Sequence, residues 1–203
     1  MSALASSLLV SLSQVRAQAV SRSYPPRGMV RCKGEPAFRS QLARDAGCLL
    51  DLDDDVDAWS CLPLALGGDE YQHLPDFHVR RGDRHTLLDV GPAPPPDWAA
   101  REASERGYDY HHWTSLEVRR GHRLGNAKDL LRYARWRCAL GDRIRLLAGL
   151  EESGTLTVAE CLPAFRETLP IAGLASLVLH RFLAVELDEA PIGPSTIVRQ
   201  FSR

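Results

Sequence analysis

Residues 73–91 constrain the fold most, because they have the pattern of two strands joined by a tight turn. Apolar and polar residues alternate over residues 77–80 and again over 88–90, which is the period of a half-buried strand. Gly82-Asp83 lies between them, and glycine adopts the positive φ of a hairpin turn without steric cost. The stretch therefore predicts an antiparallel β-hairpin.

Two aspartates flank this predicted hairpin. Asp76 opens the first strand and Asp89 lies near the end of the second. These positions lie close together in an antiparallel hairpin, and paired carboxylates suit a hard divalent cation such as Mg²⁺. We therefore predict that Asp76 and Asp89 are metal ligands and the catalytic pair of any reaction at this edge.

Pro75-Asp76 followed by Asp89-Val90-Gly91 resembles the core motif of the PD-(D/E)XK nuclease fold. More narrowly, it resembles the N-terminal domain of TnsA-type transposon endonucleases. The resemblance implies an α/β, restriction-endonuclease-like sandwich with a mixed sheet. It also implies acids that bind Mg²⁺ and a lysine that orients or activates water at the scissile phosphate. Gly91 occupies the position of that lysine.

The preceding segment extends the resemblance. The family pattern Glu-Ser-x-Leu-Glu-Arg-Asp is here Arg39-Ser-Gln-Leu-Ala-Arg-Asp, so Arg39 replaces a carboxylate that binds metal in the family. We expect the helix to begin at Glu35-Pro36, because proline suits the first helical position. Glu35 is then one turn before Arg39 and becomes the candidate third metal ligand. The acidic run at 51–57 is interpreted as a solvated helix exit.

Size and composition favour a folded globular protein. The chain has 203 residues, of which 44% are hydrophobic and 25% charged. The net charge of −1 argues against a uniformly basic surface but leaves room for a local basic patch. The five cysteines form no CxxC pair, so we interpret them as buried thiols of a reducing compartment.

The N-terminal residues 1–33 are predicted to be a leader and a basic arm. Serines interrupt the apolar run near the N-terminus, and no basic residue precedes it, which argues against a secretory signal. Arginines and a Pro25-Pro26 pair characterise residues 21–33, which fits an extended arm that either contacts phosphates or is simply solvated. No apolar run approaches the roughly 20 residues of a membrane span, so we expect a cytoplasmic protein without a membrane partner.

Residues 34–138 are predicted to form the nuclease-fold domain, and its last part is the most basic of the chain. The segment 124–133 is similar to the family pattern Leu-x-Asn-x-Lys-x-Leu-x-x-Tyr. Arginine clamps phosphate with two parallel hydrogen bonds, and lysine binds it as a point charge. The predicted DNA contacts are Arg119, Arg120, Arg123, Lys128 and Arg132.

Residues 139–203 are predicted to form a small winged-helix-like domain. Three helices are expected, with Thr157 and Glu160 forming a capping box at the second and the third running over 171–184. Residues 185–187 and 195–199 are expected to pair as the wing. The third helix carries few basic residues, so this domain suits a protein partner better than a major groove.

The resemblance implies a TnsA-like transposition protein that binds transposon-end DNA and a DDE-type transposase subunit. Two departures, Arg39 for the glutamate and Gly91 for the lysine, make cleavage doubtful, although Arg81 or Arg84 could supply the missing positive charge. A non-catalytic DNA-binding or assembly module on a nuclease scaffold is the first alternative. A transcription regulator that uses the winged helix is the second.

Overall fold

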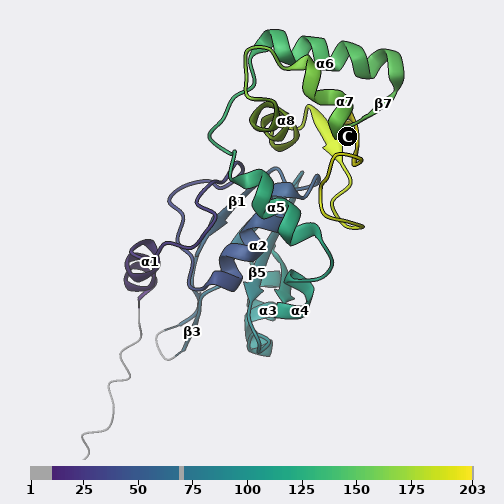
Figure 1. Ribbon diagram of the computed structural model, residues 1–203. Coiled ribbons are helices and arrows are strands. Elements are labelled where there is room, and N and C mark those ends of the chain that lie inside the picture. Colours follow the sequence, from purple (N-terminus) through teal and green to yellow (C-terminus); the bar gives the residue numbers. More distant parts are fainter. Residues whose placement is uncertain (1–10, 69–70, 203) are drawn as a thin grey trace, which may run out of the picture. The chain divides into compact units, whose positions relative to one another are not determined.

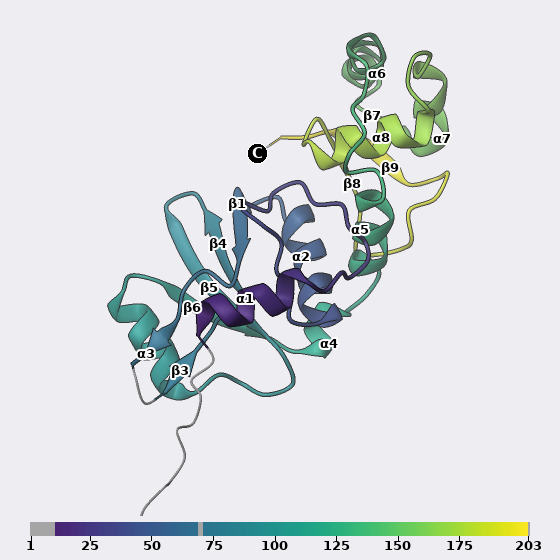
Figure 2. The same ribbon diagram turned by 90° about the vertical axis from the view of Figure 1, so that its left-hand side faces the viewer.

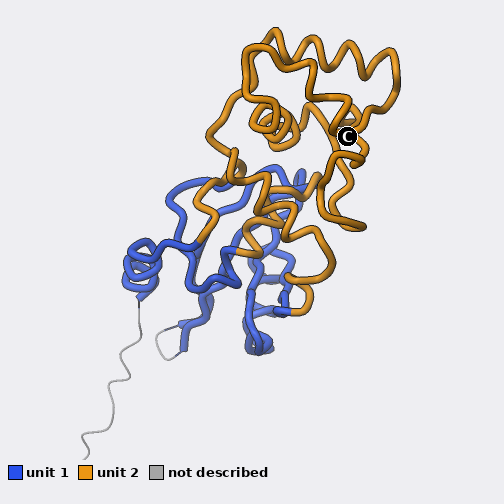
Figure 3. Tube along the Cα trace, in the orientation of Figure 1, with its two compact units in different colours: residues 1–24, 32–44, 55–115 blue, residues 25–31, 45–54, 116–203 orange. Residues whose placement is uncertain are grey.

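The computed structural model describes residues 11–68 and 71–202, so the first part of the predicted leader lies outside the described residues. The chain divides into two compact units that are interleaved along the sequence (Figure 3). Unit 1 comprises residues 1–24, 32–44 and 55–115, and unit 2 comprises 25–31, 45–54 and 116–203. No helix of the described ranges is long and apolar enough to cross a membrane.

Unit 1 is built on a four-stranded sheet in the order β1-β4-β5-β6 (Figures 1 and 2). Its strands are β1 (Ala58–Cys61), β4 (Phe77–Arg81), β5 (Arg84–Val90) and β6 (Asp109–Trp113). The first three pair antiparallel, whereas β6 runs parallel to β5. A separate two-stranded ribbon joins β2 (Leu66–Gly67) to β3 (Gln72–His73). The sequence-based prediction of a mixed sheet in an α/β protein is confirmed.

The predicted hairpin is confirmed as β4 and β5, with Phe77 opposite Leu88 and Arg81 opposite Arg84. Gly82 has a φ of 58°, the conformation that the turn required. Burial alternates along β4 as predicted, but residues 86–89 of β5 are all buried. The reason is that β5 is paired on both edges and packed on both faces, as is common next to a parallel strand.

Each face of this sheet carries its own core. Phe38, Trp59 and Phe77 form a ring cluster with centroids 5.6 to 6.2 Å apart. Leu87 points the other way and packs with Leu66 and the alanines of α3 (Asp97–Glu105). Helix α1 (Leu12–Val20) is tied to the unit by Arg16, which donates hydrogen bonds of 2.9 and 2.6 Å to the carbonyl of Leu62.

Helix α2 (Gln41–Leu52) starts later than the predicted Glu35-Pro36. The Ser40 hydroxyl accepts a hydrogen bond from the backbone N–H of Ala43 at 3.0 Å, which caps the helix there instead. The interpretation of residues 51–57 as a solvated exit is wrong for Asp51. This carboxylate is fully buried and accepts a 2.9 Å hydrogen bond from the backbone N–H of Arg31.

Unit 2 contains five more α-helices, one 3-10 turn and a three-stranded sheet in the order β7-β9-β8 (Figure 1). The helices are α4 (Ser115–Val118), α5 (Arg123–Leu131), α6 (Leu140–Ser153), α7 (Val158–Cys161) and α8 (Pro170–Leu179), and the 3-10 turn is η1 (Leu162–Ala164). The strands are β7 (Thr155–Thr157), β8 (Leu183–Val185) and β9 (Ile197–Gln200). Both strand pairs are antiparallel.

The predicted capping box at Thr157 and Glu160 is confirmed. The third helix, however, ends at Leu179 rather than 184. Arg181 has a φ of 57°, which stops the helix, and the following residues become β8. The pairing of β8 with β9 confirms the predicted hairpin, one or two residues away from its expected limits.

Asp142 on α6 holds the loop before α8 in place. Its carboxylate has no exposed surface and accepts backbone hydrogen bonds from Arg166, Glu167 and Thr168 at 2.7 to 3.2 Å. Arg145 also bonds to it. Burial raises the pKa of Asp142, but these backbone donors prevail and hold it far below its ordinary value.

We expect Asp142→Ala to lower the free energy of unfolding by about 3 kcal/mol, because it leaves buried N–H groups without acceptors. Because the folded pKa is the lower one, the carboxylate's contribution is complete above about pH 4 and is lost as the pH falls further. Urea unfolding at pH 7 and pH 3 measures both effects. Glu151→Gln, on the exposed side of the same helix, is the control and should change neither.

Candidate functional site

Asp76 and Asp89 lie close together at one end of the sheet, and Arg39 joins them. The Arg39 Nε lies 2.8 Å from Asp76 Oδ1, and its Nη2 lies 3.7 Å from Asp89 Oδ1. The hairpin register explains why the two carboxylates converge. Phe77 is opposite Leu88, so Asp76, just before Phe77, and Asp89, just after Leu88, fall at the same end of the sheet. The predicted meeting of these two carboxylates is therefore present, with a guanidinium against both.

Three further groups fix the carboxylates. The His73 Nε2 and the Tyr110 hydroxyl each lie 2.5 Å from Asp89 Oδ2. The backbone N–H of Val90 donates to Asp76 Oδ2 at 2.8 Å. Sequence reasoning missed His73 and Tyr110. Tyr110 reaches the site because β6 pairs parallel to β5, with Tyr110 opposite Leu87. Predicting this strand pairing would have been the way to find the tyrosine from the sequence.

Electrostatically, the site consists of two buried carboxylates and a partly exposed guanidinium. Burial raises the pKa of Asp76, against the opposing effect of Arg39 and the Val90 N–H. Burial opposes the charge on Arg39, but the hydrogen bond that Arg39 donates to Asp76 and the charges of both aspartates raise its pKa. Burial and the hydrogen bond to Asp89 raise the pKa of Tyr110, so its hydroxyl stays protonated and donates.

These residues do not fit a divalent cation. Mg²⁺ requires several oxygen ligands around one point, and the Arg39 guanidinium takes up the charge of Asp76 and Asp89 there. Glu35, the predicted third ligand, is exposed on the loop before α2. Within residues 11–68 and 71–202, no three histidine, cysteine or acidic side chains are grouped as a metal site requires.

Gly91, at the position of the family lysine, follows β5 directly and donates its N–H to the carbonyl of Trp113 at 3.1 Å. A Cβ at this position would meet no atom within 4 Å. Arg39, Asp76 and Asp89, together with residues 93–96, line a cavity of about 300 Å³ beside it. Packing therefore leaves room for a longer side chain at position 91. The lack of a lysine there is not a result of steric exclusion.

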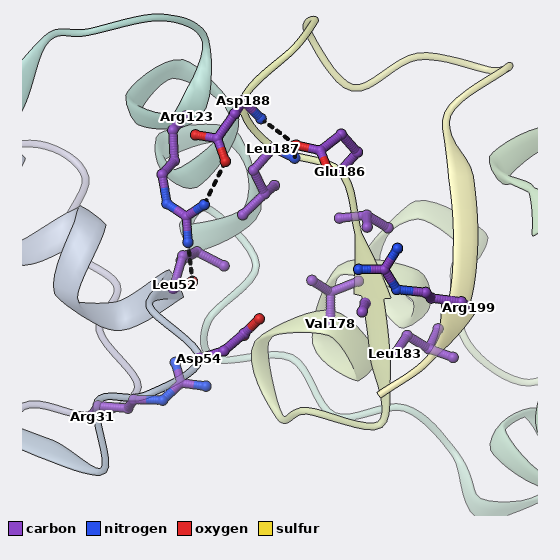
Figure 4. Close-up of a pocket in the computed structure, with 12 residues that line it drawn as sticks. Arg31, Leu52, Asp54, Arg123, Val178, Leu183, Glu186, Leu187, Asp188 and Arg199 are labelled. Atoms are coloured by element: carbon purple, nitrogen blue, oxygen red, sulfur yellow. Dashed lines mark hydrogen bonds and ion pairs between the residues drawn. The ribbon is translucent and has the colours of Figure 1, made fainter. Parts of the chain in front are cut away.

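The predicted DNA contacts divide into two groups. Arg123 lies 2.8 Å from an Asp188 carboxylate oxygen and donates to the carbonyl of Leu52 at 3.0 Å (Figure 4). Lys128 pairs at 2.8 Å with Asp45, whose side chain is only 3% exposed. Both cations therefore hold unit 2 together, which the basic pattern alone did not reveal.

Arg119 and Arg120 are exposed after α4, and Arg132 is exposed after α5 with a 3.3 Å contact to Asp129. Such a solvated pair has little energy and breaks readily for a phosphate. The family pattern also contains Asn126, which the sequence did not single out as structural. Its side-chain amide donates to the carbonyls of Leu187 and Ala190, both at 2.8 Å.

Comparison of the chain with protein-family models and with curated proteins finds no match.

We expect Arg39→Ala to lower the free energy of unfolding by about 2 kcal/mol at pH 7, because it leaves Asp76 and Asp89 buried without a counter-charge. The value is modest because the Arg39 side chain is 37% exposed. The pKa of Asp76 then rises further, and a carboxyl with a raised folded pKa is best tolerated when protonated. The loss should therefore shrink between pH 7 and pH 5 in urea unfolding.

The matched control for this substitution is Arg84→Ala. Arg84 is 78% exposed and lies 3.6 Å from Asp109, an exposed carboxylate on the neighbouring strand. We expect it to cost about 0.5 kcal/mol or less at either pH. Equal losses for both variants would contradict the role of Arg39 as the counter-charge of both carboxylates.

Proposed function

We propose that the protein is a TnsA-like DNA-binding and assembly module whose nuclease site has lost its metal. The observation that carries this proposal is the contact of Arg39 with both Asp76 and Asp89. A guanidinium fixed between two carboxylates balances their charge without a divalent cation. The pair is thereby retained as structure, and phosphodiester cleavage is not expected.

The architecture of unit 1 supports the nuclease lineage. An antiparallel hairpin, a parallel strand beside it and a helix on one face bring two acids to one end of the sheet, as the PD-(D/E)XK resemblance implies. Within this lineage the glutamate and lysine positions carry Arg39 and Gly91. The scaffold thus keeps its shape and loses two of the groups that chemistry at a phosphodiester requires.

The C-terminal part of unit 2 supports a winged-helix assignment. Helix α6, strand β7, helices α7 and α8, and the β8–β9 hairpin follow one another in the order of that fold, and β7 pairs with β9. Residues 172–179 of α8 are all buried, so this helix has little free surface for a major groove. This favours partner binding, such as a transposase subunit, over the alternative of a sequence-reading transcription regulator.

DNA binding is proposed for the exposed arginines of the segment 114–137. We expect Arg119→Gln/Arg120→Gln to reduce the slope of log affinity against log salt by about 2, because each contact with a phosphate releases counterions. Fluorescence anisotropy with a labelled duplex at several salt concentrations measures the slope. The melting temperature of this variant should not change, since both side chains are exposed.

Lys128→Met is the contrasting variant. It removes the counter-charge of the buried Asp45, so we expect it to lower the free energy of unfolding by about 2 kcal/mol. Any loss of DNA affinity should then follow the loss of folded protein. Wild-type affinity that ignored ionic strength would count against DNA binding altogether.

The absence of cleavage has its own test. We expect no nicking of supercoiled plasmid by the wild type with Mg²⁺ or Mn²⁺, and a new affinity for Mn²⁺ in Arg39→Glu, which replaces the internal cation by a third carboxylate. Nicking by the wild type that disappeared in Asp76→Ala would show an active metal site and refute the non-catalytic proposal. Isothermal titration with Mn²⁺ follows the metal directly.

A further inference from the structure

Arg31 is a buried cation whose hydrogen bonding is incomplete. Its side chain belongs to the arm segment of unit 2, and the residue is only 8% exposed. The Nη2 donates to the carbonyl of Leu179 at a long 3.4 Å, whereas the buried Nη1 has no acceptor among the described residues. A buried guanidinium without an acceptor is destabilising, so an added anion would be favourable here.

The charged groups around Arg31 are one arginine and three aspartates. Burial first, and then the charge of Arg181, lower the pKa of Arg31 to about 10, against the opposing effect of Asp51, Asp53 and Asp54. Arg31 therefore remains charged at neutral pH.

His180 is a second residue of unit 2 whose side chain has a buried nitrogen without a hydrogen-bond partner among the described residues. It follows Leu179, and its buried Nε2 has no hydrogen-bond partner in the described part of the chain. Burial lowers the pKa of His180, as do the nearby charges of Arg137 and Arg31. Arg31 and His180 therefore each hold a buried nitrogen without a hydrogen-bond partner among the described residues.

Arg31 lines a cavity of about 110 Å³. Figure 4 shows Arg31, Arg123 and Arg199 reaching it from three separate segments of unit 2. Of its three acids, Asp188 pairs with Arg123, and Glu186 Oε1 accepts hydrogen bonds from the backbone N–H groups of residues 187 and 188. Asp54 is the remaining acid, and it is exposed.

We infer that this cavity binds a phosphate group, with Arg31 as the principal ligand and Arg199 as an additional donor. The inference rests on the proposed function and deepens it, because the phosphate would be a phosphodiester of the bound DNA. A tetrahedral oxyanion presents several acceptors at once, and an acceptor is what the buried Arg31 Nη1 lacks. Asp54 competes with the anion for the same cations.

The inference is tested with the full chain by fluorescence anisotropy on a labelled duplex. We expect Arg31→Gln to weaken binding about tenfold and to reduce the salt slope by about 1. Arg101→Gln, an exposed arginine of α3 in unit 1, is the control and should leave the slope unchanged.

Because Arg31 is buried and its substitution could impair folding, Asp54→Asn provides the independent variant. It removes the exposed competing carboxylate, so binding should tighten about threefold while the melting temperature changes little. Unchanged or weaker binding in Asp54→Asn, or an unchanged slope in a folded Arg31→Gln, overturns the inference.

Inorganic phosphate separates this inference from the proposed function. We expect phosphate, at the ionic strength of a chloride control, to raise the melting temperature of the wild type but not of Arg31→Gln. If the wild type binds no DNA but phosphate stabilises it through Arg31, the site exists and the proposed function fails. If DNA binds with a steep salt dependence that Arg31→Gln does not alter, the function stands and the site is refuted.

Discussion

The contact of one guanidinium with two carboxylates governs the candidate site. Asp76 and Asp89 are buried at the same end of the sheet, and Arg39 contacts both. Two neighbouring negative charges in a buried place cannot both persist without a cation. In the nuclease fold that the sequence resembles, the cation would be a metal ion. Here Arg39 is part of the chain, so the balance is permanent and does not depend on a ligand.

An arginine in contact with both carboxylates limits the chemistry that this site can support. A metal site must be hydrated, adjustable and open to a phosphodiester. Here Arg39 is instead hydrogen-bonded to Asp76, and Tyr110 and His73 are hydrogen-bonded to Asp89. These contacts make this end of the sheet closed and rigid. Binding through arginines elsewhere is the function that we propose, since phosphate recognition needs positive charge and not a catalytic cation.

The same reasoning separates basic residues that look alike in the sequence. Lys128 and Arg123 belong to the most basic segment, but each is tied to an acid of unit 2. Arg31 differs from both, because it is buried and its Nη1 has no hydrogen-bond partner among the described residues. Local charge balance, rather than the number of basic residues, indicates where an anion would bind.

The sequence by itself determined the hairpin, its turn at Gly82, the convergence of Asp76 and Asp89, and the capping box at Thr157, because these depend on residues close in sequence. Only the tertiary structure decided the remainder. The partners of Asp89 come from β3 and β6, the acids that hold Arg123 and Lys128 are distant in the chain, and Arg181 ends α8 in a conformation that its residue type does not favour. Charge pairing and burial between remote segments leave no periodic pattern, so they become visible only when the chain is folded.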